Sequence, residues 1–181
     1  VTRAQYDACV AEGGCEATTS TADPADWAEL PMTGMSFTEA SEYCAFLGAR
    51  LPTEAEWELA ARGPNSQRFP WGDQTPDCSH ASLPGCGQPL APVGTHPLGE
   101  SPYGIHDLVG NALELVSDGY DPTPFQARGP SFTPSPLSLF MRTVRGNTSW
   151  DTTQMHAAYR IGMPTAARSA MLGFRCARST N

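Results

Sequence analysis

Apolar residues in the first third of the chain recur with the spacing of α-helices. Around Trp57 and Ala61 they form one stripe on a short segment with clear ends. Thr53 can cap the start of this segment, and Glu56, three residues later, completes a capping box. Gly63 is a typical helix terminator. The pattern predicts a helix between Thr53 and Gly63.

The capping-box signal occurs twice more, upstream of the first. The two pairs are Thr2 with Gln5 and Ser36 with Glu39. They predict one helix that reaches about Gly13 and another that reaches Gly48.

After Pro64 the helical periodicity stops, and short apolar runs alternate with Gly, Pro, Asn and Asp. The runs are residues 90–94, 104–105, 112–116, 142–145 and 173–177. Residues 121–137, with many prolines, are expected to form an ordered surface loop. A few short helices packed on a small, irregular antiparallel sheet, with much loop, make an α+β fold. At 181 residues the chain is expected to be one domain, residues 1–181.

The amino-acid composition excludes one class of binding partner. The net charge is −8, and every one of the 11 basic residues is arginine. A nucleic-acid partner is not expected, because phosphate binding needs a basic face. No apolar run approaches the length of a transmembrane helix.

Six cysteines allow fifteen pairings, so spacing alone does not choose between them. They are Cys9 and Cys15 around a turn, Cys78 and Cys86 around a loop, Cys44 in a predicted helix and Cys176 in the last apolar run. The number of cysteines is even, and several of them lie close together in the sequence. Both features favour disulfides, and therefore an oxidising compartment. Reduced, buried thiols are the alternative.

Residues 50–63 read Arg-Leu-Pro-Thr-Glu-Ala-Glu-Trp-Glu-Leu-Ala-Ala-Arg-Gly, and Phe-Pro-Trp-Gly-Asp follows at 69–73. This run resembles the signature of the formylglycine-generating enzyme family, the sulfatase-modifying factors. Further blocks resemble the family in the same order, at residues 1–9, 43–48, 91–94, 101–104, 107–118, 145–150 and 173–176. The resemblance implies an elaborated C-type-lectin-like fold. It also implies that the family's N-terminal strand and a leader would precede Val1.

The resemblance also implies a cysteine pairing. Family members commonly tie the helix before the Arg-Leu-Pro motif to the Gly-Phe-Arg-Cys strand, which gives Cys44–Cys176. The pairs Cys9–Cys15 and Cys78–Cys86 then remain. We therefore expect an extracytoplasmic protein that is secreted, periplasmic or surface-attached.

The oxidases of the family bind copper through two cysteines four residues apart. The matching stretch here is residues 151–156, and no cysteine lies between Cys86 and Cys176. Cu(I) prefers soft thiolates, so we expect no copper and no formylglycine synthesis. Met155 with His156 offers too few ligands to replace the pair. The four histidines, at 80, 96, 106 and 156, share no metal-ligand spacing for zinc or iron.

Calcium is the expected metal, because the family wraps Ca²⁺ with the block that matches residues 107–114. The implied ligands are the side chains of Asp107 and Glu114 and the carbonyls of Gly110 and Ala112. Hard oxygen ligands on an irregular loop suit this ion. The alternative is an ordinary turn whose acidic side chains face water. The family's second calcium site, near residues 82–88, is not expected.

The resemblance places five residues near the pocket in which the oxidases hold their peptide: Trp150, Asp151, Gln154, Tyr159 and Arg160. They form a candidate ligand-binding surface for a protein, peptide or glycan. Alternatively, the two aromatic residues are part of the core. We expect a calcium-stabilised binding module rather than an enzyme. The alternatives are a sulfatase-modifying-type enzyme using the same cleft, and a diversified ligand-display protein that varies residues 150–172.

Overall fold

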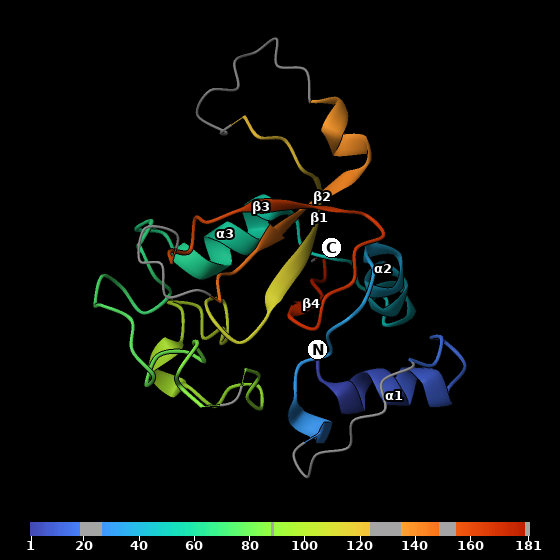
Figure 1. The fold of residues 1–181 in the computed structure, drawn as a ribbon, viewed down its shortest axis with the longest axis horizontal. Coiled ribbons are helices and arrows are strands. Elements are labelled where there is room, and N and C mark those ends of the chain that lie inside the picture. The colour runs from blue at the N-terminus through green and yellow to red at the C-terminus, as the bar shows by residue number, and fades with distance from the viewer. Residues whose placement is uncertain (19–26, 88, 124–134, 149–154, 180–181) are drawn as a thin grey trace.

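The computed structural model describes residues 1–181 apart from 19–26, 88, 124–134, 149–154 and 180–181 (Figure 1). Its α-helices are α1 (Arg3–Ala11), α2 (Phe37–Phe46) and α3 (Glu54–Arg62). Its strands are β1 (Leu113–Gly119), β2 (Met141–Arg145), β3 (Ile161–Pro164) and β4 (Leu172–Phe174). Short 3-10 helices occupy Trp27–Glu29, Pro97–Gly99 and Pro136–Leu139.

All three predicted helix starts are confirmed. The N-cap residues Thr2, Ser36 and Thr53 each accept a hydrogen bond from the backbone three residues on, and a side chain from that position reaches back to the cap. Both orphan donors are thereby satisfied at each start. Gly63 ends α3 with a φ of +63°, a conformation that favours glycine. Local signals therefore position every α-helix among the described residues.

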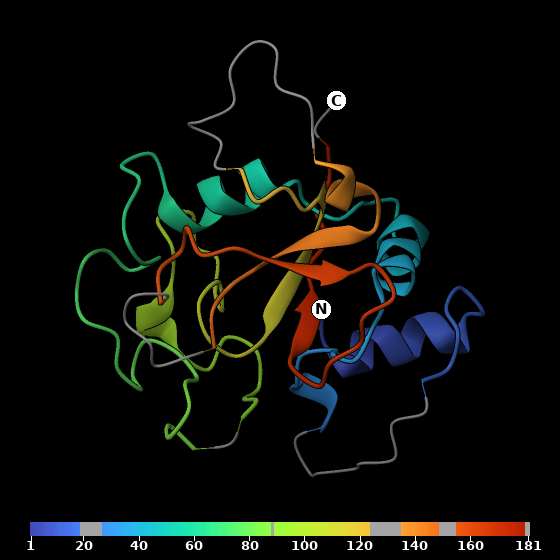
Figure 2. The ribbon, with the colours of Figure 1, turned by 45° about the horizontal axis from the view of Figure 1, so that its top comes forward.

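The strands form one sheet in the order β3-β2-β1-β4, and all four are visible in Figure 2. The pairs β1–β2 and β2–β3 are antiparallel, but β1 and β4 are parallel, with Leu115 opposite Phe174. The α+β class with a small sheet is confirmed, but the sheet is mixed rather than antiparallel throughout. Residues 165–171 carry the chain from the edge strand β3 to the opposite edge of the sheet, where β4 runs in the same direction as β1.

The apolar runs were only partly strands. Residues 112–116, 142–145 and 173–177 overlap β1, β2 and β4, but 90–94 and 104–105 lie in loops outside the strands. Strand β3 lies in a segment that showed no strand signal. Its residues pair with β2 from Met141 to Val144, so the neighbouring strand rather than local sequence defines it.

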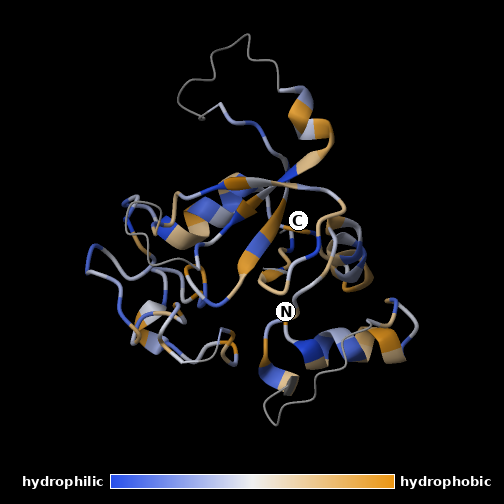
Figure 3. Ribbon diagram, in the orientation of Figure 1, coloured by the Kyte–Doolittle hydropathy of each residue, from blue (hydrophilic) through white to orange (hydrophobic). Residues whose placement is uncertain are grey.

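Strand β1 separates two hydrophobic clusters, because successive side chains on a strand point to opposite faces. Leu115 packs with α1, α2 and β4 through Tyr6 and Tyr43. Val116 packs in the second cluster with Trp57 of α3. The helices α1 and α2 thus cover one face and α3 the other, with hydrophilic and hydrophobic positions interleaved along α3 (Figure 3).

Three disulfides hold this arrangement: Cys9–Cys15, Cys44–Cys176 and Cys78–Cys86. Their Cα–Cα distances are 5.4, 5.5 and 5.3 Å. All six cysteines are used, as the resemblance implied, and the long bridge ties α2 to the end of the chain. Three disulfides indicate an oxidising compartment.

The predicted surface loop at 121–137 falls mostly outside the described residues. Its base is closed by the buried carboxylate of Asp121, which accepts hydrogen bonds from the backbone of Thr123 and Ser135. Within the part of the chain that is described, no helix has the length and apolar character needed to cross a membrane.

Candidate functional site

A cavity of about 340 Å³ lies between the start of the chain, the loop before β1 and the end of β4. It brings together Asp107, Ala112 and Glu114 of the expected calcium set, and Arg175 also lines it. Gly110 is not part of its lining. The site therefore assembles most of the expected ligands and adds a cation that the sequence reasoning did not anticipate.

Gly110 has a structural role beside this cavity. Its φ is +83°, and a Cβ there would lie 2.7 Å from the backbone oxygen of Ser82. Its amide donates a hydrogen bond to the carbonyl of Asn147 at 2.7 Å. Only glycine permits this close approach without a clash.

Glu114 is buried on β1 and is held by two donors. Trp57 Nε1 donates to Oε2 at 2.6 Å, and Arg175 donates to both oxygens at 2.7 and 2.6 Å. Burial alone would lower the pKa of Arg175, but attraction and hydrogen bonding to Glu114 outweigh burial, and the pKa is raised. Arg175 therefore keeps its positive charge at neutral pH.

Asp107 lies on the irregular loop that leads into β1. Its φ is +59°, as is that of Asn111, and non-glycine residues seldom adopt this conformation. Asp107 Oδ2 accepts a hydrogen bond from the Gly94 amide at 2.8 Å. The Asn111 side chain pairs with both backbone groups of Ala91 at 3.0 and 3.1 Å. Two side chains thus hold residues 91–94 against this loop.

The oxygen donors fit calcium in kind. Glu114 uses three of its four lone-pair positions for Trp57 and Arg175, which leaves one on Oε1. Among the described residues, none donates a hydrogen bond to Oδ1 of Asp107. A calcium ion would share Glu114 with Arg175.

The candidate ligand surface is only partly described. Trp150, Asp151 and Gln154 lie outside the described residues. Tyr159 is half-buried and meets His156 edge-to-face, with ring centroids 6.3 Å apart.

Arg160 is held mainly by the protein itself. Its guanidinium donates to both carboxylate oxygens of Glu54, at 2.6 and 3.0 Å, and to the Asp121 carbonyl at 2.6 Å. It also stacks over the Tyr120 ring at 5.1 Å. Arg160 therefore fixes the segment that carries Tyr159, with 17% of its side chain still exposed.

A buried arginine supports the same segment. Arg145, 0% exposed at the end of β2, donates to Glu54 at 3.2 Å and to Glu58 at 2.9 Å. It also donates to the carbonyls of Ala157 and Ala158 at 2.9 and 3.3 Å. Burial lowers the pKa of Arg145, and the two glutamates act against that effect. We call Arg145, Arg160, Glu54 and Glu58 the arginine–glutamate network.

Sequence reasoning missed this network. Glu54 lies in the first turn of α3, where a carboxylate also suits the helix dipole, but it is only 1% exposed. The available signal was the spacing of Glu54, Trp57, Glu58 and Ala61, which places all four on one side of the helix. With Trp57 on that side, the two glutamates also face the interior.

His156 stands in a positive environment beside this network. Burial lowers its pKa first, and the positive charges of Arg68, Arg145 and Arg62 lower the pKa further. The imidazole is therefore neutral at pH values where an ordinary histidine is partly charged.

Solved structures share this architecture. PvdO from Pseudomonas aeruginosa superposes with a TM-score of 0.79 at 23% identity, covering 99% of this chain and 78% of that one. Treponema denticola variable protein 1 gives a TM-score of 0.72 at 18% identity, covering 96% and 80%. At such identities the likeness establishes the fold alone.

Proteins related in sequence bear on the family as well as on the fold. Inactive C-alpha-formylglycine-generating enzyme 2 of Mus musculus is 34% identical over 176 residues, covering 83% of this chain and 50% of that protein. Hercynine oxygenase of Mycolicibacterium smegmatis is 38% identical over 130 residues, covering 66% and 30%. The chain thus spans half or less of these relatives. Residues 1–180 match the Sulfatase-modifying factor enzyme 1-like domain. With its fold and sequence relatives in agreement, the chain belongs to this family of formylglycine-generating-enzyme-like domains.

Proposed function

We propose that this domain is a non-oxidase member of its family and works as a binding module outside the cytoplasm. One observation carries the proposal: the three disulfides take up all six cysteines. A Cu(I) site of the family's kind needs two thiolates, and a disulfide sulfur cannot replace them. A relative that is itself named inactive supports the same reading.

The binding surface in this proposal contains Trp150, Asp151, Gln154 and Tyr159. Tyr159 lies next to Arg160, on a segment held by the arginine–glutamate network. Such support lowers the entropy lost when a ligand binds. The partner classes are a protein, a peptide or a glycan.

Calcium has a structural role in this proposal. Asp107 and Glu114 would hold the ion with backbone oxygens of the same loop. The ion would join the two carboxylates and stabilise the entry to β1.

The test is a reaction that should fail. A peptide of the form Cys-x-Pro-x-Arg is incubated with the protein, copper and a mild reductant, and its mass is compared with a copper-only control. The peptide should stay unmodified. Conversion above the control would overturn the proposal.

Catalysis of another kind in the same cleft is a second candidate, favoured by His156. Its lowered pKa keeps the imidazole neutral and able to accept a proton near Tyr159. The similarity to hercynine oxygenase points the same way. Metal analysis separates the candidates, because stoichiometric iron or copper would support an enzyme and calcium alone a binding module.

A further inference from the structure

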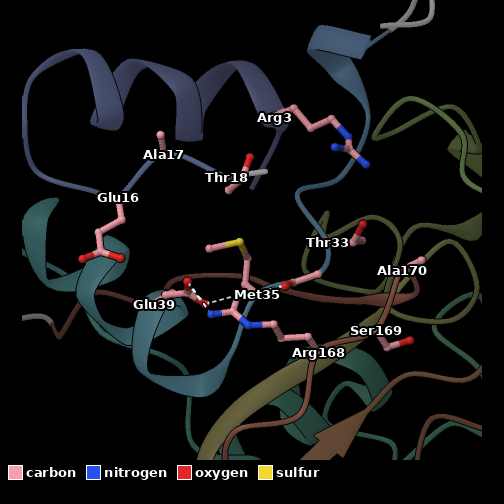
Figure 4. A pocket seen from close by; sticks show the side chains of 11 residues that line it. Arg3, Glu16, Ala17, Thr18, Thr33, Met35, Glu39, Arg168, Ser169 and Ala170 are labelled. Atoms are coloured by element: carbon pink, nitrogen blue, oxygen red, sulfur yellow. Dashed lines mark hydrogen bonds and ion pairs between the residues drawn. The ribbon is translucent and has the colours of Figure 1, made fainter. Parts of the chain in front are cut away.

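A second cavity, of about 610 Å³, lies between α1, the start of α2 and the segment that joins β3 to β4 (Figure 4). It shares no lining residue with the cavity at Asp107 and Glu114, and none of its residues belongs to the proposed binding surface around Tyr159. Its volume is typical of sites for small ligands. Four charged residues line it: Arg3, Glu16, Glu39 and Arg168.

The cavity lies in the acidic part of the chain. The first 48 residues, which supply α1 and α2, hold eight acidic side chains and one basic one, so they carry a charge of −7 out of the total of −8. The pKa of Tyr6 in α1 reflects this charge. Burial raises the pKa first, the carboxylates of Glu39, Glu16 and Glu42 raise it further, and Arg168 acts in the opposite direction. Such a one-sided field raises the local concentration of cations.

The two arginines of the lining are attracted to carboxylates of the protein itself. Arg168 contacts Glu39 at 2.6 and 2.7 Å, and the hydrogen bonds to Glu39 raise the pKa of Arg168. Burial lowers the pKa of Arg3, and attraction to Asp7, one turn further along α1, acts in the opposite direction. Two carboxylates thus stand against the two guanidinium groups, and Glu16 is additional to them.

Glu16 presents a carboxylate that no residue of the described chain engages. Its side chain is exposed, and among the described residues none donates a hydrogen bond to its carboxylate. Its backbone is fixed, because the Tyr6 hydroxyl donates to the Glu16 carbonyl at 3.2 Å and the disulfide Cys9–Cys15 ends directly before it. A fixed carboxylate in acidic surroundings favours an organic cation.

Thr33 supplies an unused polar group in the same cavity. The residue lines the cavity although it is only 8% exposed, and none of the described residues hydrogen-bonds to its hydroxyl. Its methyl group lies 3.6 Å from where a Cβ on Gly173 would be, so the methyl faces β4 and leaves the hydroxyl to the cavity. Figure 4 shows Glu16 and Thr33 on opposite sides, with Met35 between them. A buried hydroxyl without a partner favours a ligand that can hydrogen-bond to it.

We infer that this cavity binds the side chain of a lysine from a partner protein. Its ammonium would meet Glu16, its methylenes would pack against buried Met35, and the peptide groups at its base would hydrogen-bond to the Thr33 hydroxyl. All 11 basic residues of this chain are arginine, so the lysine must come from another molecule.

Titration with Nα-acetyl-lysine N-methylamide, followed by NMR at the amides of Glu16 and Thr33, tests this inference. The probe carries the lysine side chain between two peptide groups. The norleucine and Nε-acetyl-lysine analogues lack the charge, so each should bind about tenfold more weakly. n-Butylamine keeps the ammonium and the methylenes without peptide groups, and it should bind about fivefold more weakly.

Matched variants locate the binding. Glu16→Gln should weaken binding of the lysine probe about tenfold, and Glu12→Gln, at an exposed position outside the cavity, should not change it. Thr33→Val removes the hydroxyl at nearly constant volume and should weaken binding about fivefold, whereas Thr38→Val, at an exposed position, should not. Circular dichroism confirms that each variant is folded. Thr33→Val should not lower the melting temperature, because no hydrogen bond within the described chain is lost.

Four results would overturn the inference. They are no shift of either amide with the lysine probe, equal binding of the charged and uncharged probes, binding that Glu16→Gln leaves unchanged, and binding of n-butylamine as tight as that of the lysine probe. The last result would assign the cavity to free amines. None of the four bears on formylglycine synthesis or on the surface around Tyr159, so this inference and the proposed function fail separately.

Discussion

Arg175 donates two hydrogen bonds, 2.7 and 2.6 Å long, to the carboxylate of Glu114 across the parallel pair of strands β1 and β4. The register places Glu114 opposite Gly173, two residues before Arg175. The pair joins the last strand of the chain to the centre of the sheet, beside the proposed calcium site.

Glu114→Gln should destabilise the protein by about 3 kcal/mol, because Arg175 would keep its partly buried charge without a carboxylate. Urea denaturation measures the effect. Glu12→Gln changes an exposed glutamate and should leave the midpoint unchanged. A small effect of Glu114→Gln would mean that water replaces the carboxylate at Arg175.

Removal of calcium should lower the melting temperature, because Asp107 and Glu114 would then share one cavity with no ion between them. Calcium at a hundredfold excess over its Kd would stabilise the native state by about 2.7 kcal/mol. Scanning calorimetry with chelator, and then with added calcium, measures the shift. Asp107→Ala should abolish it, and Asp73→Ala, at an exposed position, should not.

Arg145→Lys should destabilise the fold by about 3 kcal/mol, although the charge is kept. A lysine ammonium cannot serve the two glutamates and two carbonyls that the Arg145 guanidinium serves. Arg62→Lys is the matched control, since Arg62 is partly exposed and should cost less than about 1 kcal/mol. Equal losses in the two variants would contradict a special role for Arg145.

The contribution of Glu56 should depend on pH. Hydrogen bonds from Arg50 and from the Thr53 backbone lower its pKa from 4.5 to about 2. A carboxylate whose pKa is lowered in the folded state stabilises the protein at pH values above its pKa in the unfolded state. This stabilisation is lost as the pH falls through the pKa of the folded state. The stability difference between wild type and Glu56→Gln should therefore be constant at neutral pH and vanish between about pH 4.5 and 2. Carboxyl NMR titration of Glu56 checks the midpoint.

The disulfides should differ in their contribution to stability. Cys44–Cys176 spans 132 residues and Cys9–Cys15 spans 6. On the chain-entropy model, loss of the first costs about 5 kcal/mol and loss of the second about 2 kcal/mol. Paired Cys→Ser variants, compared by denaturation, test the ratio. Equal losses would show that loop length is not the governing factor.

Local signals predicted the helices well. Each capping box is contained within four residues, so its outcome depends little on the rest of the fold. The disulfide pairing came from the family resemblance and is confirmed. Neither the helix prediction nor the disulfide prediction depends on knowing which strands pair in the sheet.

Long-range pairing was the part that sequence could not supply. Strand β3 depends on its pairing with β2, and the parallel direction of β4 depends on the path of residues 165–171. The burial of Glu54 has the same kind of cause, because its partners Arg145 and Arg160 are 91 and 106 residues away in the sequence. A carboxylate on a helix is expected to face solvent when the positions of its cationic partners in the fold are unknown.

Because Leu115 and Val116 lie in different hydrophobic clusters, neither cluster can open without disturbing the strand that they share. The amides of β1 should therefore be among the slowest in the protein to exchange with deuterium, and only through complete unfolding. The two halves of the molecule, α1 and α2 on one face and α3 on the other, would then melt as a single cooperative unit.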